Sequence, residues 1–343
     1  MGKKHLFLFA SLVLSGVLLF LIFSQNSLSQ WHRLISRIRV ELLLLFVVLY
    51  AIGLLIRTWR YQLLIRGSQT ERVPSFGQLA LVTAVRNMLV DLLPARSGSL
   101  SYLVIMNRVF AVDFSACLSS FTYAVLFDLL TLGPLLAVVL FIDTWKGAAV
   151  HPVLWGAGMI ITLAGFSAIA FLEPLFRGIS QWVEGLTGSF QKKHPWTKTL
   201  ARHLTETSRS FLALRRARLF WPLLGLSLVL RTIKYSLLYL LLYAVVEAIR
   251  DAPLALPFLK VLFGIMASEV AASLPISGIA GFGLYEGILG GTLTGQGITA
   301  SEGIFISFAM HLLSQVFEYS LGLTALGVIL IIWLRGGKRS GIY

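Results

Sequence analysis

Long apolar runs are the feature that most constrains how this chain can fold. Six of them approach or exceed the roughly 20 residues that a helix needs to cross a lipid bilayer. They cover residues 6–23, 42–56, 115–142, 153–172, 219–246 and 303–334. Over the whole chain 57% of residues are hydrophobic and 13% are charged, against about 45–50% apolar and about 25% charged in a soluble domain. These runs predict an all-α polytopic membrane protein with about six transmembrane helices.

Two further apolar stretches are interrupted by proline and glycine. Residues 76–110 are broken at 92–98, and residues 256–293 are broken at 274–283. Non-helical backbone at membrane depth is tolerated only where protein buries it or where it lines a cavity. We therefore favour two re-entrant helical hairpins over the alternative, which is two ordinary pairs of spans joined by surface turns.

Basic residues predict the orientation in the membrane. If the N-terminus is cytoplasmic, 18 of the 29 Lys and Arg residues fall in cytoplasmic segments and five fall outside, which is the bias expected from the positive-inside rule. Both termini are then cytoplasmic. Residues 24–26, Ser-Gln-Asn, make a poor cleavage site, so the first run is interpreted as an uncleaved span. The net charge of +14 then reports topology and contact with anionic phospholipids, not nucleic acid.

The same topology gives the two hairpins opposite orientations. Both carry Leu-Pro followed by Ser-Gly, a short similarity of the kind found in inverted-repeat transporters, whose broken helices meet at the substrate site. We predict one integral membrane domain over residues 1–343, with hairpins at 76–110 and 256–293. The cytoplasmic linker 173–218 includes a predicted amphipathic helix at 175–186 and is too small for a catalytic domain of ordinary size.

Ionisable and polar residues inside these apolar stretches are the candidate substrate site, because charges within a membrane cost about 2.5–3.5 kcal/mol each on insertion scales. They line a cavity or, on the alternative interpretation, only hold helices together. Those in the first hairpin and the middle spans are Arg86, Asn87, Asp91, Arg96, Ser97, Gly98, Asp128, Arg231 and Lys234. Those in the second hairpin and the last span are Glu269, Ser277, Gly281, Gly283, Tyr285, Glu286, His311, Gln315 and Glu318.

Chemistry suggests roles within this set. Guanidinium groups bind phosphate through two hydrogen bonds at once, so Arg86 and Arg96 are candidates for an anionic headgroup, with Arg231 or Lys234 as further cations. Asp128 needs a cationic partner, which any of these four residues could supply. The acidic residues balance charge or carry protons.

Several classes of site are disfavoured. The chain has no P-loop, and His311, Gln315 and Glu318 lack the spacing of a His-Glu-x-x-His zinc site. The single cysteine, Cys117, excludes an intrachain disulfide and any multi-cysteine metal site. We expect no catalytic residue, no metal and no cofactor.

Two segments resemble a known family. Asn87-Met-Leu-Val-Asp-Leu-Leu-Pro-Ala-Arg-Ser-Gly98 and Ser273-Leu-Pro-Ile-Ser-Gly-Ile-Ala-Gly-Phe-Gly-Leu-Tyr-Glu286 are similar to motifs of the flippase-like transmembrane domain family. That family includes the membrane domain of lysylphosphatidylglycerol synthase and the YbhN-type proteins. Asp128 matches the family's acidic position in a middle span. Ser99 departs from the pattern, since a glutamate usually follows the glycine of the first motif.

The resemblance implies a function. It points to a translocase (a flippase) that moves a lipid or lipid-linked glycan across the bacterial cytoplasmic (inner) membrane. It implies no enzyme activity, since the soluble aminoacyl-transfer domain of the synthase is not among these residues. The alternatives are a membrane-embedded transferase acting on lipid-linked substrates, a small-solute or ion transporter, and an accessory subunit of a cell-envelope enzyme. A homo-oligomer or an envelope-biosynthesis partner is also expected.

Overall fold

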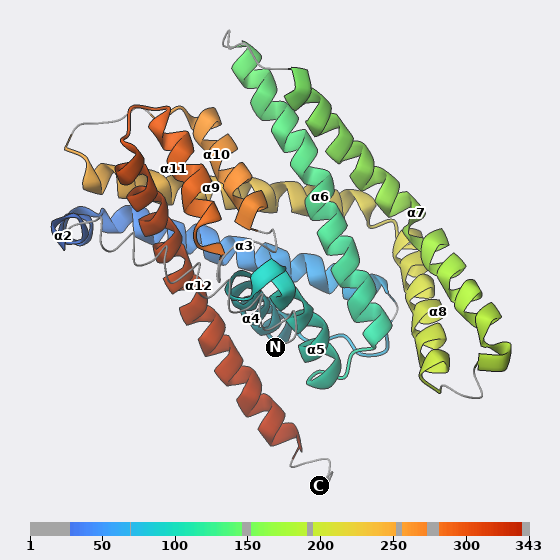
Figure 1. Cartoon of the computed structure of the whole chain (residues 1–343). Coiled ribbons are helices and arrows are strands. Elements are labelled where there is room, and N and C mark those ends of the chain that lie inside the picture. The colour runs from blue at the N-terminus through green and yellow to red at the C-terminus, as the bar shows by residue number, and fades with distance from the viewer. Residues whose placement is uncertain are drawn as a thin grey trace, which may run out of the picture. The chain divides into compact units, whose positions relative to one another are not determined.

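The computed structural model describes residues 28–68, 70–145, 152–190, 195–251, 256–272 and 281–337, and every regular element within them is a helix (Figure 1). The first helices are α2 (Leu28–Arg37), α3 (Val40–Gly67), α4 (Phe76–Leu92), η1 (Pro94–Leu100) and α5 (Ser101–Arg108). The middle helices are α6 (Phe114–Trp145), α7 (Pro152–Phe190), α8 (Pro195–Arg216) and α9 (Phe220–Ile249). The last are α10 (Phe258–Ala272), α11 (Leu284–Thr294) and α12 (Ala300–Gly337). The predicted span 6–23 and the candidate residue Ser277 lie outside the described residues.

The chain divides into two compact units. Unit 1 contains Met1–Gly53, Ala84–Ser101 and Ile233–Tyr343, and unit 2 contains Leu54–Thr83 and Tyr102–Thr232. The helices α3, α4 and α9 each contribute residues to both units. Each unit is therefore assembled from segments that lie far apart in the sequence.

Four helices are long and apolar enough to cross a membrane. They are Val40–Gly67, Phe114–Ile142, Phe220–Ile249 and Ala300–Arg335, and they match four of the six predicted spans. The predicted span 153–172 lies within α7. The apolar segment of α7 that the structure shows, Gly158–Leu172, is shorter than the four spans above. A polytopic helical membrane protein is therefore confirmed for the described part of the chain.

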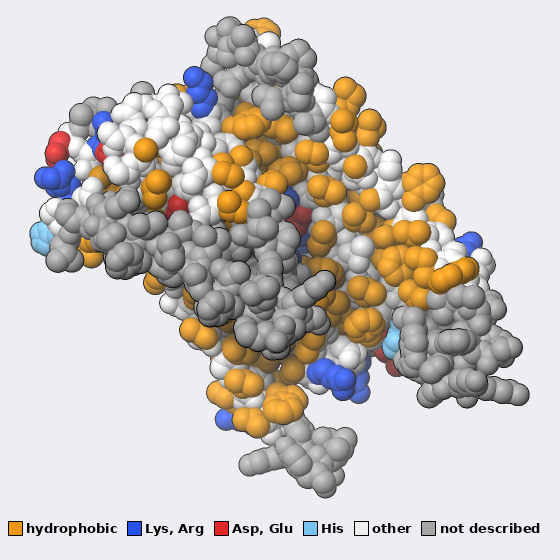
Figure 2. Space-filling model, viewed as in Figure 1, with side chains coloured by type: hydrophobic (Ala, Val, Ile, Leu, Met, Phe, Trp, Pro, Cys, Tyr) orange, Lys and Arg blue, Asp and Glu red, His pale blue; other side chains and the backbone are white. Residues whose placement is uncertain are grey.

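Apolar side chains lie over much of the described surface that Figure 2 shows, and many large hydrophobic side chains are exposed. On α12, Leu323, Leu330 and Trp333 are exposed, and on α3 the exposed side chains include Leu44 and Val48. A soluble protein rarely exposes contiguous apolar patches of such extent. These apolar helix faces are suited to contact with the acyl chains of lipids.

The first interrupted stretch changes from α-helix to a 3-10 turn at its proline. The helix α4 ends at Leu92, and η1 begins with Pro94, whose missing N–H makes it acceptable in a first turn. Gly98 then packs against the backbone of α4, so closely that a Cβ at this position would overlap the Leu89 carbonyl. A glycine is required here because the chain touches backbone directly.

The second interrupted stretch contains the short helices α10 and α11, which pack against each other, and α11 also packs on α12. Gly290 makes the close contact with α12, since a Cβ there would lie 3.0 Å from the backbone nitrogen of Ile304. No described atom lies within 4 Å of a Cβ built on Gly287 or Gly291.

The helix α7 runs without interruption through Pro174 to Phe190. The helix predicted at 175–186 is therefore present as the second part of α7, in one piece with the predicted span. The following helix, α8, packs on both α6 and α7, and Phe211 of α8 contacts Tyr123 and Phe176 at ring-centroid distances of 5.5 and 5.0 Å.

Glycines allow α6 and α7 to pack backbone against backbone, which is how membrane helices commonly associate. A Cβ on Gly165 would lie 2.9 Å from the Cα of Leu130, and a Cβ on Gly133 would lie 2.6 Å from the carbonyl oxygen of Gly158. The mid-helix proline, Pro134, follows directly after one of these glycines. The interface thus has no room for side chains at either position.

We expect Gly165→Val to destabilise the protein by about 2 kcal/mol, the usual scale for overpacking a close-packed interface. The added side chain collides with backbone, which cannot rotate away as a flexible side chain can. Thermal unfolding of the purified protein in detergent measures the effect. Gly156→Val is the matched control on the same helix, because no described atom lies within 4 Å of a Cβ there. Equal destabilisation by the two substitutions would contradict the proposed packing.

Candidate functional site

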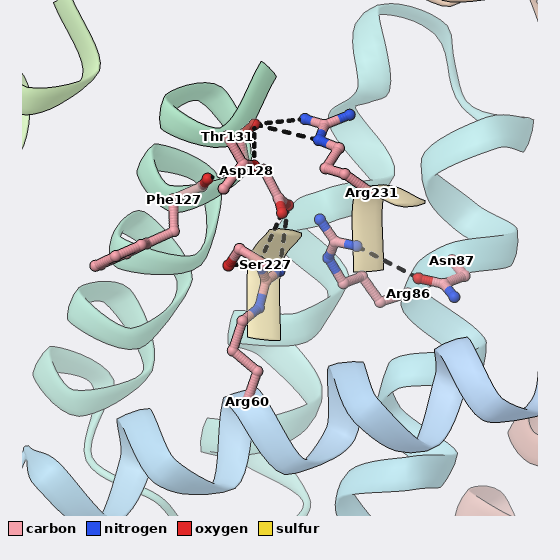
Figure 3. Close-up of polar contacts among 8 residues, drawn as sticks. All are labelled: Arg60, Arg86, Asn87, Phe127, Asp128, Thr131, Ser227 and Arg231. Carbon is pink, nitrogen blue, oxygen red and sulfur yellow. Dashed lines mark hydrogen bonds and ion pairs between the residues drawn. The ribbon is translucent and has the colours of Figure 1, made fainter. Parts of the chain in front are cut away.

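A buried ion pair joins α3 and α6 in unit 2 (Figure 3). Arg60 donates from Nη1 to Oδ1 of Asp128 at 2.6 Å and from Nη2 to Oδ2 at 3.2 Å. The Arg60 side chain is 1% exposed and that of Asp128 is 32% exposed. This two-bond geometry fixes the orientation of both groups and makes the pair a strong one.

The helix α9 completes this cluster. Arg60 also donates to the hydroxyl of Ser227 at 2.8 Å. Arg231 donates from Nη2 and Nε to the backbone carbonyl of Asp128, at 2.7 and 3.2 Å, as the dashed lines in Figure 3 show. Side chains of α3 and α9 therefore meet at Asp128 of α6.

Sequence reasoning missed Arg60. The predicted span 42–56 ends before it, whereas α3 continues to Gly67 and buries this residue. Of the four cations suggested for Asp128, Arg231 does lie in this cluster, on the backbone carbonyl of Asp128. The signal that could have found Arg60 is the apolar sequence Tyr61-Gln-Leu-Leu-Ile65, which extends the span beyond it.

A second buried cluster lies in unit 1 and centres on Glu286 and His311. Oε1 of Glu286 lies 2.6 Å from Nδ1 of His311, and Nε2 of His311 lies 2.8 Å from Nε2 of Gln315. The side chains of Glu286 and His311 are 2% and 12% exposed. The aromatic rings of Phe282 and Tyr285 pack beside His311, at ring-centroid distances of 4.8 and 4.4 Å.

The start of α11 positions Glu286. Its second carboxylate oxygen accepts a hydrogen bond from the backbone N–H of Gly283, which is the half of a capping box that the N3 residue supplies. Gly281 and Gly283 have φ angles of 77° and 104°, in the region that favours glycine. The chain can therefore turn tightly enough to place the carboxylate over its own helix N-terminus, where the helix dipole favours negative charge.

Tyr285 marks where further acidic groups gather. Its buried hydroxyl interacts electrostatically with Glu269 of α10, Glu286 of α11 and Asp91 of α4. Tyr319 of α12 likewise interacts with Asp91 and Glu318. Carboxylates predicted from separate segments of the sequence thus come together in unit 1.

Cations lie among these carboxylates. The Nζ atom of Lys234 is 2.5 Å from Oε1 of Glu269, and their side chains are 31% and 14% exposed. Arg96 donates to the backbone carbonyl of Glu269 at 3.3 Å. Arg96 itself is exposed and has a φ of 53°, a left-handed conformation that costs a residue with a Cβ about 1 kcal/mol or more.

A third group of contacts joins α3, α4 and α12 within unit 1. The hydroxyl of Tyr50 donates to Glu318 at 3.0 Å and accepts from the side-chain amide of Asn87 at 3.4 Å. Arg86 donates to the amide oxygen of Asn87 at 3.4 Å (Figure 3). Tyr50 was not predicted as a site residue, because a tyrosine in an apolar span carries no distinctive signal.

Ion pairs outside the membrane-spanning helices connect α2 to the residue Asp251, which follows α9. Arg33 and Arg37 both bind Asp251. The hydrogen bond from Arg37, followed by the charge of Arg33, holds the pKa of Asp251 below its ordinary value. The lowered pKa means that the ion pairs stabilise the ionised carboxylate of Asp251. The ion pairs are therefore retained at neutral pH and are lost as pH falls through the lowered pKa.

The structure therefore divides the predicted site residues between the two units. Unit 2 holds Asp128 and Arg231. Unit 1 holds Arg86, Asn87, Asp91, Arg96, Ser97, Gly98, Lys234, Glu269, Gly281, Gly283, Tyr285, Glu286, His311, Gln315 and Glu318. Ser97 is exposed, and Gly98 has the packing role described above.

We expect Asp128→Leu to destabilise the protein by about 3–5 kcal/mol, because it leaves the Arg60 guanidinium buried without its counter-charge. The free energy of unfolding in mixed detergent and denaturant measures this loss. The double variant Arg60→Met/Asp128→Leu is the control, since removing both charges together is often nearly neutral. A double variant that is at least as unstable as Asp128→Leu alone would contradict the pairing.

Comparison with known proteins places the chain in a family. A family model described as lysylphosphatidylglycerol synthase TM region matches residues 8–322. No curated protein matches the chain, and no solved structure matches it. The match includes both hairpin motifs, the Asp128 cluster and the Glu286 cluster, so the resemblance in the two motifs is confirmed. The chain belongs to the family of the lysylphosphatidylglycerol synthase transmembrane region.

Proposed function

We propose that this protein translocates a lipid or a lipid-linked headgroup across the bacterial inner membrane. The observation that carries the proposal is the collection of charged side chains within unit 1, in a chain whose helices expose apolar faces. We call this collection the unit 1 cluster. It contains Arg86, Asp91, Arg96, Lys234, Glu269, Glu286, His311 and Glu318.

The cost of placing charged groups in a membrane supports a functional role for the unit 1 cluster. Ionisable groups in membrane helices are rare because each is costly to insert, and those that persist commonly mark a transport pathway. A purely structural role would need only a few matched pairs, as in the Arg60–Asp128 contact of unit 2. The unit 1 cluster instead draws side chains from α4, η1, α9, α10, α11 and α12.

The binding chemistry of these charged groups also supports a functional role. Arg96 is exposed, and Lys234 is 31% exposed beside Glu269, so cationic groups lie within reach of a ligand. Arginine and lysine bind phosphate, and neighbouring carboxylates can bind an amine. A polar headgroup can satisfy such a cluster while its acyl chains stay against the apolar helix faces.

The remaining parts of the proposal concern architecture. We take the interrupted segments as re-entrant hairpins of opposite orientation, related as inverted repeats, with both termini cytoplasmic. The helices α4, α10 and α11 have 17, 15 and 11 residues, all fewer than the roughly 20 needed for a full crossing, which supports this interpretation. Membrane lipid is then the main partner.

We propose transport without a catalytic step, although the family name refers to a synthase. The described residues contain no group of three or more His, Cys, Asp or Glu that could hold a metal ion. Purified protein incubated with lipid and candidate donor molecules should yield no new lipid species by mass spectrometry. Formation of a new species, lost in Glu286→Gln, would instead favour a membrane-embedded transferase.

Reconstituted vesicles test the proposal directly. Protein in vesicles of phosphatidylcholine and phosphatidylglycerol should accelerate movement of a fluorescent phosphatidylglycerol between leaflets, measured by dithionite quenching. Arg96→Gln and Glu286→Gln should each slow this movement at least about tenfold, since a lost hydrogen bond to a charged group is worth about 1.5–3 kcal/mol.

The matched control is Asp251→Asn, which also removes one charge from unit 1 but does so at an exposed position outside the spans. It should leave lipid movement unchanged. Wild-type protein that fails to move phosphatidylglycerol, aminoacylated phosphatidylglycerol and polyprenyl-linked lipids alike would overturn the proposal.

A further inference from the structure

The hydrogen-bond partners of the Glu286–His311 pair suit one arrangement of its protons. The amide nitrogen of Gln315 can only donate, so Nε2 of His311 accepts at 2.8 Å. In a neutral imidazole the proton is then on Nδ1 and is donated to Oε1 of Glu286 at 2.6 Å. The backbone N–H of Gly283 donates to the other carboxylate oxygen. In this arrangement the pair carries one negative charge.

One more proton fits this site after a small movement. Protonation of Nε2 turns it into a donor, and a rotation of the Gln315 amide that exchanges its nitrogen and oxygen presents an acceptor to it. The pair then becomes an imidazolium beside a carboxylate and carries no net charge. Histidine is the side chain that most readily gains and loses a proton in proteins, and the Glu286 carboxylate beside it can balance the added charge.

The charges around the pair give the added proton a consequence. Glu269, Glu286, Asp91 and Tyr235 all interact electrostatically with Tyr285, whose ring centroid lies 4.4 Å from that of His311. Lys234 of α9 and Arg96 of η1 both bind Glu269, and Glu318 of α12 is held by Tyr50 of α3, which Asn87 links to Arg86. From α2, the contact with this part of α12 is the uncharged Trp31, which packs on Phe305 and Phe308.

The balance of these charges depends on His311. The unit 1 cluster contains four carboxylates and three cations besides histidine. With a neutral His311 its formal charge is −1, and with a protonated His311 it is 0. An anionic phosphate therefore enters a cluster of like sign in one state and a neutral cluster in the other. Electrostatics favours binding of the phosphate together with the proton.

We propose that the Glu286–His311 pair is a proton-binding site and that one proton binds together with a phosphate-bearing headgroup. The inference rests on the proposed lipid function and adds the ion that is coupled to it. By linkage, acidification strengthens headgroup binding, and headgroup binding draws in a proton. A pH difference across the membrane then drives lipid movement in the direction in which protons flow.

Binding calorimetry tests the coupling without requiring transport. Short-chain phosphatidylglycerol is titrated into purified protein at pH 6.5, in two buffers with different ionisation enthalpies, which gives the number of protons taken up. We expect a net uptake of protons on binding, and by linkage an affinity that rises about fivefold from pH 7.5 to 6. Glycerol 3-phosphate in place of the lipid should bind more weakly, and equal binding would make a free phosphate ester the ligand instead.

Substitutions at two histidines test whether His311 is the group that takes up the proton. His311→Gln should abolish both the proton uptake and the pH dependence while retaining some binding, because Gln can still bond to Glu286. His32→Gln, at an exposed histidine of α2, should behave as wild type. Proton uptake that persists in His311→Gln would overturn the assignment.

The outcomes separate this inference from the proposed function. Binding with proton uptake, but without lipid movement in vesicles, would support the proton site and refute translocation. Lipid movement with no linked proton at any pH from 5.5 to 8 would support translocation and refute the coupling. Absence of binding by any phosphate-bearing lipid would refute the coupling as well, since it requires a bound headgroup.

Discussion

The ion pair between Arg60 and Asp128 shows the constraint under which this chain folds. A charge in an apolar environment needs an opposite charge and hydrogen bonds, or its burial is prohibitively expensive. In unit 2 this requirement is met by two bonds between guanidinium and carboxylate, a hydroxyl from Ser227, and Arg231 on the adjacent carbonyl. Three helices are tied together at one point because no single helix could satisfy these groups.

The same requirement is met differently in unit 1. There the charged groups outnumber what simple pairing needs, and several of them remain partly exposed. Glu286 is held by its own helix N-terminus and by His311, while Arg96 keeps a left-handed backbone conformation and an exposed side chain. Unit 1 thus presents an exposed arginine beside Glu269, which suits a ligand that arrives and leaves.

Sequence reasoning predicted most of these features because membrane burial leaves clear traces in a sequence. Charged residues such as Lys234 and Glu318 are conspicuous in apolar runs, and Pro94 and Gly98 mark a break in the helix. It failed where the sequence pattern was ambiguous, as at Arg60. Arg60 lies near the end of a helix, where a basic residue looks the same whether it reaches the headgroups or turns inward. The contribution of α3, α4 and α9 to both units depends on long-range packing, which no local pattern encodes.

The position of Arg60 in the chain has a consequence for how the protein is made. Its partners follow 68 residues later, in Asp128, and 167 residues later, in Ser227. At synthesis rates of about 5–20 residues per second, α3 leaves the ribosome several seconds before its counter-charge exists. During that interval the long side chain can extend toward the headgroup region, where its charge is tolerated. Membrane integration of α3 therefore precedes its final packing, and the arrival of α6 draws the guanidinium inward.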